Sequence, residues 1–197
     1  TPVYHSAYDN FAWFKRFADT SFVYGPALAR LDGTLALRLA NADVLPYDVA
    51  RYAKDLRGHV EALATRAEAS NRPLSFAGLT ATIDTLAQAA AAFEQARAER
   101  LADGPPPNAS ALNDTLLSLE QAFLHADGMP FGDQYRSLYA SPNPFNGYAS
   151  WMLPGLRHPI ETEAPADTID RWTAVYRDAI ETLTGRVRAA TAQVRGR

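Results

Sequence analysis

Histidine is the residue type in this chain best suited to catalysis or metal binding, and one of the four histidines stands in a suggestive setting. His5 lies in the stretch "VYHSAYDN", between Tyr4 and Ser6 and just before a helix-like run of aromatic residues. This is the kind of place where a strand ends and a metal ligand points into a cleft. One imidazole is not a complete metal site, so the remaining ligands have to be sought elsewhere.

The other three histidines favour structural roles. His59 falls inside a helical pattern, where an exposed or hydrogen-bonded side chain is the expectation. His125 lies near a predicted helix end, where it would interact with the helix dipole. His158 precedes Pro159 and is expected in a loop. No pair of histidines has ligand spacing, and the common catalytic and nucleotide-binding motifs are absent.

Composition narrows the classes of partner. The 197 residues carry a formal net charge of −3, with 19 Lys and Arg against 22 Asp and Glu. Such a balance gives no general attraction to nucleic acid or to an anionic membrane surface. The chain has no cysteine, which excludes disulfides and thiolate ligands. No apolar run approaches the roughly 20 residues that span a bilayer. We therefore expect neither nucleic acid nor a membrane as a partner.

The elements that position these residues are predominantly helical. Phe11, Phe14 and Phe17 recur at about one helical turn, and a second segment opening at Pro26 places leucines on one face. Pro46 ends this region, because proline disfavours a helical residue before it. The pattern predicts two helices and a domain boundary near residue 46.

Four longer helical patterns follow: about 48–70, a segment capped by Ser75 and ending at Gly104, about 109–125, and a segment from Asp167 almost to the C-terminus. Each carries one apolar stripe, and four such stripes need one another as partners. We predict an all-α fold, a four-helix bundle. The stripes are Val49, Tyr52, Leu56, Val60 and Leu63; Phe76, Leu79, Ile83, Leu86, Ala90 and Phe93; Leu112, Leu116, Leu119 and Phe123; and Ile169, Trp172, Tyr176, Ala179, Leu183, Val187, Ala190 and Val194.

A long loop, residues 126–166, separates the third and fourth of these helices. Loops of this length without secondary structure are uncommon in compact domains and are usually functional. Its aromatic content argues against a disordered linker, so it should fold back onto another part of the protein. The aromatic residues are Phe131, Tyr135, Tyr139, Phe145, Tyr148 and Trp151.

Two stretches carry a family resemblance. "YHSAYDNFAWFKRF", followed by "LARLDGTLALRLANADVLPYDVARYAKDLR", resembles the C-terminal part of the glutamate carboxypeptidase and transferrin receptor family. The shared features are the Tyr-His-Ser motif, the Ala-Asn-x-x-Val-Leu-Pro motif of residues 40–46, and the Tyr52-Ala53 and Leu56-Arg57 pairs that follow. The resemblance covers essentially the whole chain.

The resemblance implies roles for the first residues. Members built as peptidases use two co-catalytic zinc ions, and the histidine of the Tyr-His-Ser motif is the last of five ligands. Carried over, His5 is a zinc ligand, and Tyr4 is placed to stabilise the tetrahedral intermediate by a hydrogen bond. The other ligands and the general base belong upstream of Thr1. We therefore expect no zinc in the isolated chain and two zinc ions in a longer protein.

The resemblance also implies a role for the aromatic loop. A Lys-Tyr pair in this loop helps glutamate carboxypeptidases to bind the C-terminal glutamate of the substrate, and the matching residues are Gly147 and Tyr148. Tyr148 keeps the hydroxyl group that could bind a carboxylate. Gly147 supplies no cation, which puts a preference for acidic substrates in doubt.

Together these features predict a remnant of a zinc-peptidase domain in residues 1–46 and a helical dimerisation domain in residues 47–197. The isolated chain is then a homodimeric interaction module without catalytic activity. The alternative is that the chain is one portion of an active dizinc exopeptidase that acts on peptides. A third class, a non-enzymatic binder like the transferrin receptor, is disfavoured by the presence of Tyr4 and His5. Bacterial relatives of this type are expected to be exported.

Overall fold

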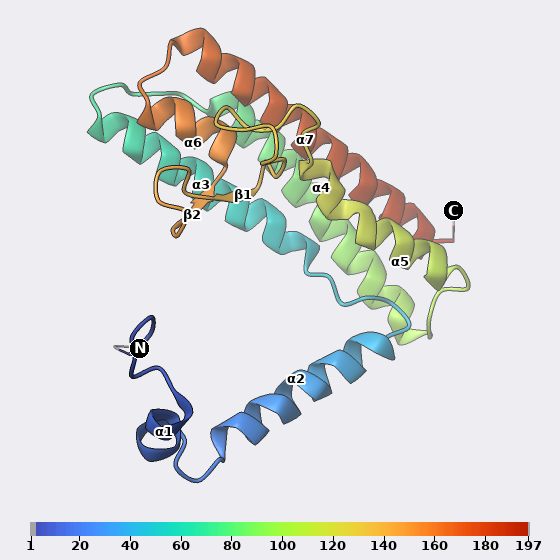
Figure 1. Cartoon of the computed structure of the whole chain (residues 1–197). Helices are drawn as coiled ribbons and strands as arrows, with labels where there is room; N and C mark the ends of the chain where they lie inside the picture. Colours follow the sequence, from blue (N-terminus) through green and yellow to red (C-terminus); the bar gives the residue numbers. More distant parts are fainter. Residues whose placement is uncertain (1–2, 197) are drawn as a thin grey trace. The chain divides into compact units, whose positions relative to one another are not determined.

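The computed structural model describes residues 3–196. The chain forms two compact units, with the division between Pro46 and Tyr47. Figure 1 shows a short helical segment followed by a long helix in the first unit, and a bundle of helices in the second. Within the described residues, no helix is both long and apolar enough to cross a membrane.

The first unit contains three helical elements. α1 (Phe11–Trp13) continues into the π-helical η1 (Phe14–Ala18), and α2 (Tyr24–Ala40) follows. The buried Asp19 carboxylate accepts hydrogen bonds from the backbone N–H groups of residues 23, 24 and 25, at 2.8, 3.0 and 3.1 Å. These N–H groups have no partner inside the helix, so Asp19 fixes where α2 begins. The prediction of a start at Pro26 was therefore two residues too late.

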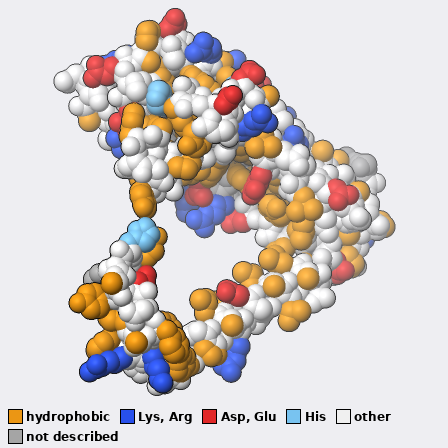
Figure 2. Space-filling view, viewed as in Figure 1, with side chains coloured by type: hydrophobic (Ala, Val, Ile, Leu, Met, Phe, Trp, Pro, Cys, Tyr) orange, Lys and Arg blue, Asp and Glu red, His pale blue; other side chains and the backbone are white. Residues whose placement is uncertain are grey.

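The apolar side chains of the first unit are largely exposed (Figure 2). Neither α1, η1 nor α2 contains a buried residue. The exposed large hydrophobic residues of α2 are Tyr24, Leu28, Leu31, Leu35, Leu37 and Leu39. A helix with this much exposed apolar surface is typical of an element that packs against further protein.

The second unit is the predicted helical bundle. It comprises α3 (Val49–Ala69), α4 (Ala77–Ala102), α5 (Ala109–Ser118) with the 3₁₀ turn η2 (Leu119–Phe123), and α7 (Ala166–Val194). Figure 1 shows α4 and α7 packed along each other, with α3 and α5 beside them. The predicted stripe residues are buried, except that Tyr52 is half-buried. The all-α prediction is confirmed.

Two helix ends differ from the prediction. α4 takes Phe76 rather than Ser75 as its N-cap, without a side-chain hydrogen bond, because Phe76 turns into the core and is 6% exposed. α5 ends at Ser118 and tightens into η2, so the helical segment stops at Phe123 and not at residue 125.

The predicted loop contains further secondary structure. β1 (Ala140–Pro142) and β2 (Ser150–Met152) pair antiparallel, with Ser141 opposite Trp151. α6 (Pro154–Glu161) follows, so the expectation of a loop around His158 was wrong. Pro154 suits the first turn. Pro159 has no N–H to donate within the helix, and α6 ends two residues after it.

Buried contacts anchor this segment to the bundle, as predicted from its aromatic content. The Tyr176 hydroxyl of α7 donates to the carbonyl of Leu138 at 2.7 Å and accepts from the N–H of Gly155 at 3.0 Å. Trp151 is 2% exposed, and a Cβ on Gly155 would lie 2.5 Å from Trp172. The segment 138–161 is thereby fixed against α7.

Candidate functional site

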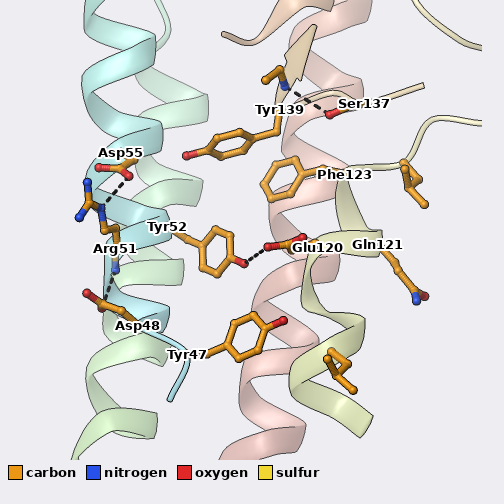
Figure 3. A pocket seen from close by; sticks show the side chains of 13 residues that line it. Tyr47, Asp48, Arg51, Tyr52, Asp55, Glu120, Gln121, Phe123, Ser137 and Tyr139 are labelled. Carbon is orange, nitrogen blue, oxygen red and sulfur yellow. Dashed lines mark hydrogen bonds and ion pairs between the residues drawn. The ribbon is translucent and has the colours of Figure 1, made fainter. Parts of the chain in front are cut away.

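The second unit contains a groove between α3 and the segment that runs from η2 to β1. Its volume is about 680 Å³, within the range of ligand-binding clefts. Figure 3 shows the rings of Tyr47, Tyr52 and Tyr139 in this groove. We call it the tyrosine groove; it is lined by Tyr47, Asp48, Arg51, Tyr52, Asp55, Leu117, Glu120, Gln121, Phe123, Leu124, Ser137, Tyr139 and Ala140.

A hydrogen bond crosses the tyrosine groove. The Tyr52 hydroxyl of α3 donates to Glu120 Oε1 of η2 at 3.2 Å (Figure 3). Burial raises the pKa of Tyr52, and the adjacent Glu120 carboxylate raises it further. Burial likewise raises the pKa of Tyr139, with a contribution from Asp55. Both phenols therefore stay protonated at neutral pH, and the Tyr52 hydroxyl serves as a hydrogen-bond donor.

The charged residues of the groove partly compensate one another. Arg51 Nε lies 3.1 Å from Asp55 Oδ2, and the Arg51 backbone N–H donates to Asp48 Oδ1 at 3.1 Å. With Glu120, the lining holds three carboxylates and one guanidinium, a formal charge of −2. The arrangement is suited to recognition and contains no nucleophile paired with a base. Tyr52 was predicted from the sequence as a core residue, and the groove was not predicted. Its one local signal is a tyrosine in an otherwise aliphatic stripe.

Tyr4 and His5, the predicted zinc-site residues, lie together in the first unit. Their rings stack with centroids 3.8 Å apart and planes at 21°. Both residues are exposed to solvent. His5 has a left-handed backbone conformation, with φ of 60°. A short turn holds the pair, with Ser6 Oγ donating to the Val3 carbonyl at 2.7 Å.

The described residues do not fit a zinc pair by themselves. Within residues 3–196, no group of three or more His, Asp or Glu side chains could hold a metal ion. A single imidazole falls short of the four ligands of an ordinary zinc site. A zinc role for His5 therefore depends on ligands outside this chain.

Gly147 and Tyr148, the predicted substrate-binding residues, lie at the tip of the β1–β2 connection. Gly147 has φ of +76°, which favours glycine, and no other atom lies within 4 Å of where its Cβ would stand. The Asn146 side chain accepts from the Tyr148 N–H at 3.0 Å, and Asn143 Oδ1 accepts from the Phe145 N–H at 2.8 Å. Tyr148 is 80% exposed, so its hydroxyl group is presented to solvent.

The remaining histidines take part in aromatic packing. His59 meets Tyr139 edge-on at 5.8 Å, His125 meets Trp172 edge-on at 5.4 Å, and His158 packs against Phe131 at 5.3 Å. Burial lowers the pKa of His158, which favours the neutral ring. His158 thus acts as an aromatic contact of α6.

The second unit is an all-α bundle that carries the tyrosine groove beside α3. The particular family follows from comparison with known proteins: residues 74–194 match the model of the transferrin receptor-like dimerisation domain. The chain belongs to this family, and the resemblance stated from sequence is confirmed.

Curated relatives extend the match toward the N-terminus. The chain is 31% identical over 174 residues to a probable glutamate carboxypeptidase, LAMP1, of Arabidopsis thaliana, which covers 88% of this chain and 25% of the relative. It is 32% identical over 146 residues to the aminopeptidase NAALADL1 of Mus musculus, covering 72% and 20%. A probable glutamate carboxypeptidase of Zea mays, VP8, is 29% identical over 202 residues, covering 96% and 27%. The chain thus spans about a quarter of the length of these relatives or less.

Proposed function

We propose that this chain is the dimerisation part of a longer protein and that its bundle pairs two copies in a twofold homodimer. The observation that carries the proposal is the family match over residues 74–194, which includes α4, α5, α6 and α7. Identical chains most often associate with closed twofold symmetry. A standard interface buries roughly 1,600 Å² in total, which is within reach of helices of 26 and 29 residues.

Light scattering at micromolar concentration tests the proposal on the full chain and on a shortened chain that begins at Pro46. Dimers of both chains support association through the bundle. A monomeric full chain refutes the homodimer. A dimer that disappears with residues 1–45 assigns the contact to the exposed apolar surface of the first unit instead.

A second proposal concerns the longer protein, which we infer to be a dizinc exopeptidase. Support comes from the relatives, which are named as probable glutamate carboxypeptidases and an aminopeptidase. In that protein His5 serves as one zinc ligand, and Tyr4 donates a hydrogen bond to the reacting group. The intact mass of the natural polypeptide shows whether several hundred further residues exist. Zinc content that is unchanged by His5→Ala in that polypeptide argues against the ligand role.

The residues at the tip of the β1–β2 connection are relevant to the substrate preference of that longer protein. We propose that Gly147 weakens the preference for acidic C-terminal residues, because losing a cation beside a charged carboxylate costs about 1–3 kcal/mol. Tyr148 then orients a smaller or apolar substrate end. Rates on substrates ending in Glu and in Leu are compared for the natural protein and for Tyr148→Phe. A strong Glu preference that survives Tyr148→Phe means that the pocket lies elsewhere.

A further inference from the structure

The connection between β1 and β2 contains the dipeptide Asn146-Gly147, and both residues are exposed to solvent. We propose that Asn146 is a site of spontaneous covalent modification, at which the side-chain amide is converted to a carboxylate through a cyclic imide. The reaction needs only water and the protein's own backbone. It adds one negative charge at the tip of the connection, next to Tyr148.

The conversion has two steps, and nothing is oxidised or reduced in either. The backbone nitrogen of Gly147 attacks Cγ of Asn146, so that an N–Cγ bond forms and the Cγ–Nδ2 bond breaks. Nδ2 leaves as ammonia, with the proton that the Gly147 nitrogen gives up. Water then adds to one of the two carbonyl carbons of the ring, and the bond from that carbon to the Gly147 nitrogen breaks. Opening at Cγ leaves an aspartate at position 146, and opening at the backbone carbon leaves an isoaspartate.

The turn at Asn146 favours the first step. Asn146 Oδ1 accepts a hydrogen bond from the Tyr148 N–H at 3.0 Å. This bond folds the side chain back along its own backbone and brings Cγ toward the Gly147 nitrogen. It also polarises the amide carbonyl group, which makes Cγ more electrophilic. The electrophile is therefore held in place by the loop itself.

Gly147 leaves the attacking nitrogen open to approach. It has no Cβ, and no other atom lies within 4 Å of where a Cβ would stand. Glycine also changes its φ at little cost, so the backbone can rotate into the geometry of attack. The Gly147 N–H donates to the Asn143 carbonyl at 2.8 Å, and this bond has to open first. Because it lies at the exposed end of two strands of three residues each, local opening is easy.

Asn143 provides a comparison within the same connection. Its Oδ1 accepts from the Phe145 N–H at 2.8 Å, which is the same turn geometry three residues earlier. The next residue is Pro144, whose nitrogen carries no hydrogen and cannot form the imide. The remaining asparagines all precede a residue with a side chain, which hinders the approach of the nitrogen; they stand at positions 10, 41, 71, 108 and 113. The reaction is therefore expected to be fastest at Asn146.

The new charge has a consequence for substrate choice in the longer protein. It lies beside Gly147 and Tyr148, and this consequence rests on their proposed function, whereas the modification itself does not. A carboxylate at position 146 repels the carboxylate of an acidic substrate end, and Gly147 supplies no cation to offset it. Modification should therefore lower the rate on substrates that end in Glu relative to those that end in Leu.

Peptide mapping by mass spectrometry tests the modification in the full chain, after incubation in neutral and in alkaline buffer. The segment around residue 146 should gain the mass difference between an amide and a carboxylate, with separate aspartate and isoaspartate products on chromatography. The rate should rise with pH, because the Gly147 nitrogen has to lose its proton. Asn143 should stay unmodified under the same conditions.

Two variants serve as matched controls, and circular dichroism verifies that each is folded. Asn146→Gln keeps an amide but would need a larger ring, so position 146 should stay unmodified over the same period. Gly147→Ala should slow the conversion at least about tenfold, because its Cβ shields the nitrogen and restricts φ. An Asn146 amide that persists in alkaline buffer, or that converts no faster than in Gly147→Ala, overturns the inference.

The consequence for substrate choice is tested separately, on the longer protein with Asn146→Asp as a mimic of the product. The ratio of the rates on Glu-ending and Leu-ending substrates should fall about two- to fivefold, the range expected for one exposed charge pair. An unchanged ratio, with the mass shift present in the natural chain, overturns the proposed role of the tip in substrate binding and leaves the modification site standing.

Discussion

At the scale of single residues, Tyr176 links three parts of the second unit. Its hydroxyl group is fully buried and bonds both the Leu138 carbonyl and the Gly155 N–H. Removing the hydroxyl leaves two buried backbone groups unsatisfied, which is more costly than losing one exposed hydrogen bond. The Tyr176 phenol therefore holds the segment 138–161 against α7.

We expect Tyr176→Phe to lower the free energy of unfolding by about 1–3 kcal/mol, the cost of the stranded backbone groups. Urea denaturation followed by circular dichroism measures the change. Tyr148→Phe is the matched control, since Tyr148 is 80% exposed, and it should stay within about 0.5 kcal/mol of the natural chain. Equal stability of the two variants would show that the buried hydroxyl contributes nothing.

A second prediction at the scale of single residues concerns zinc binding at His5. The isolated chain should retain no stoichiometric zinc after dialysis and should hydrolyse neither dipeptides nor N-acylated dipeptides, because one imidazole cannot hold two ions. Metal analysis and an amino-acid release assay check this. Stoichiometric zinc together with turnover that is lost in His5→Ala would contradict the prediction.

At the scale of elements, the close contact between α6 and α7 requires a glycine at position 155. A Cβ on Gly155 would stand 2.5 Å from Trp172 Cε3, so glycine is needed for the two helices to approach. Gly58 in α3 is a useful contrast, since nothing lies within 4 Å of where its Cβ would stand.

Substitution by alanine should have opposite effects on stability at Gly155 and at Gly58. Gly155→Ala should destabilise the protein by about 1–3 kcal/mol through overpacking. Gly58→Ala should stabilise it by up to about 1 kcal/mol, because alanine favours a helix interior. Thermal and urea unfolding of both variants measure the difference. A stable Gly155→Ala variant would mean that α6 shifts easily and is not firmly held against α7.

At the scale of the whole molecule, the buried phenols make stability depend on pH. Burial raises the pKa of Tyr52, Tyr139 and Tyr176 above the usual value of about 10. The folded state therefore binds these protons more tightly than the unfolded chain does. Their contribution is complete below about pH 10 and is lost as pH rises toward the higher folded-state pKa.

We expect the free energy of unfolding to fall steeply above about pH 10, by up to about 1.4 kcal/mol per pH unit for each affected phenol. Tyr176→Phe should make this fall shallower, because one of the protonated groups is removed. Urea denaturation at pH 8, 10 and 11 measures the slope, with Tyr148→Phe as the control for the substitution itself. A slope that is the same in both variants would contradict the assignment.

The elements that could be predicted from the amino-acid sequence are those with local signals. The apolar stripes at steps of three and four residues predicted the bundle helices and most of their core, because these patterns repeat within one helix. The motifs around His5 and Pro46 indicated the family, which the comparison confirmed. The roles of Tyr4, His5, Gly147 and Tyr148 stay predictions.

Features that depend on residues far apart in the chain could not be predicted in this way. α6 was missed because two prolines mask its helical pattern, and it is held by Tyr176 and Trp172 of α7. The tyrosine groove joins Tyr52 to Glu120, 68 residues apart. The start of α2 was set by Asp19, outside the helix. Such contacts are made by packing and have no periodic signal in the sequence, so they appear only when the elements have come together.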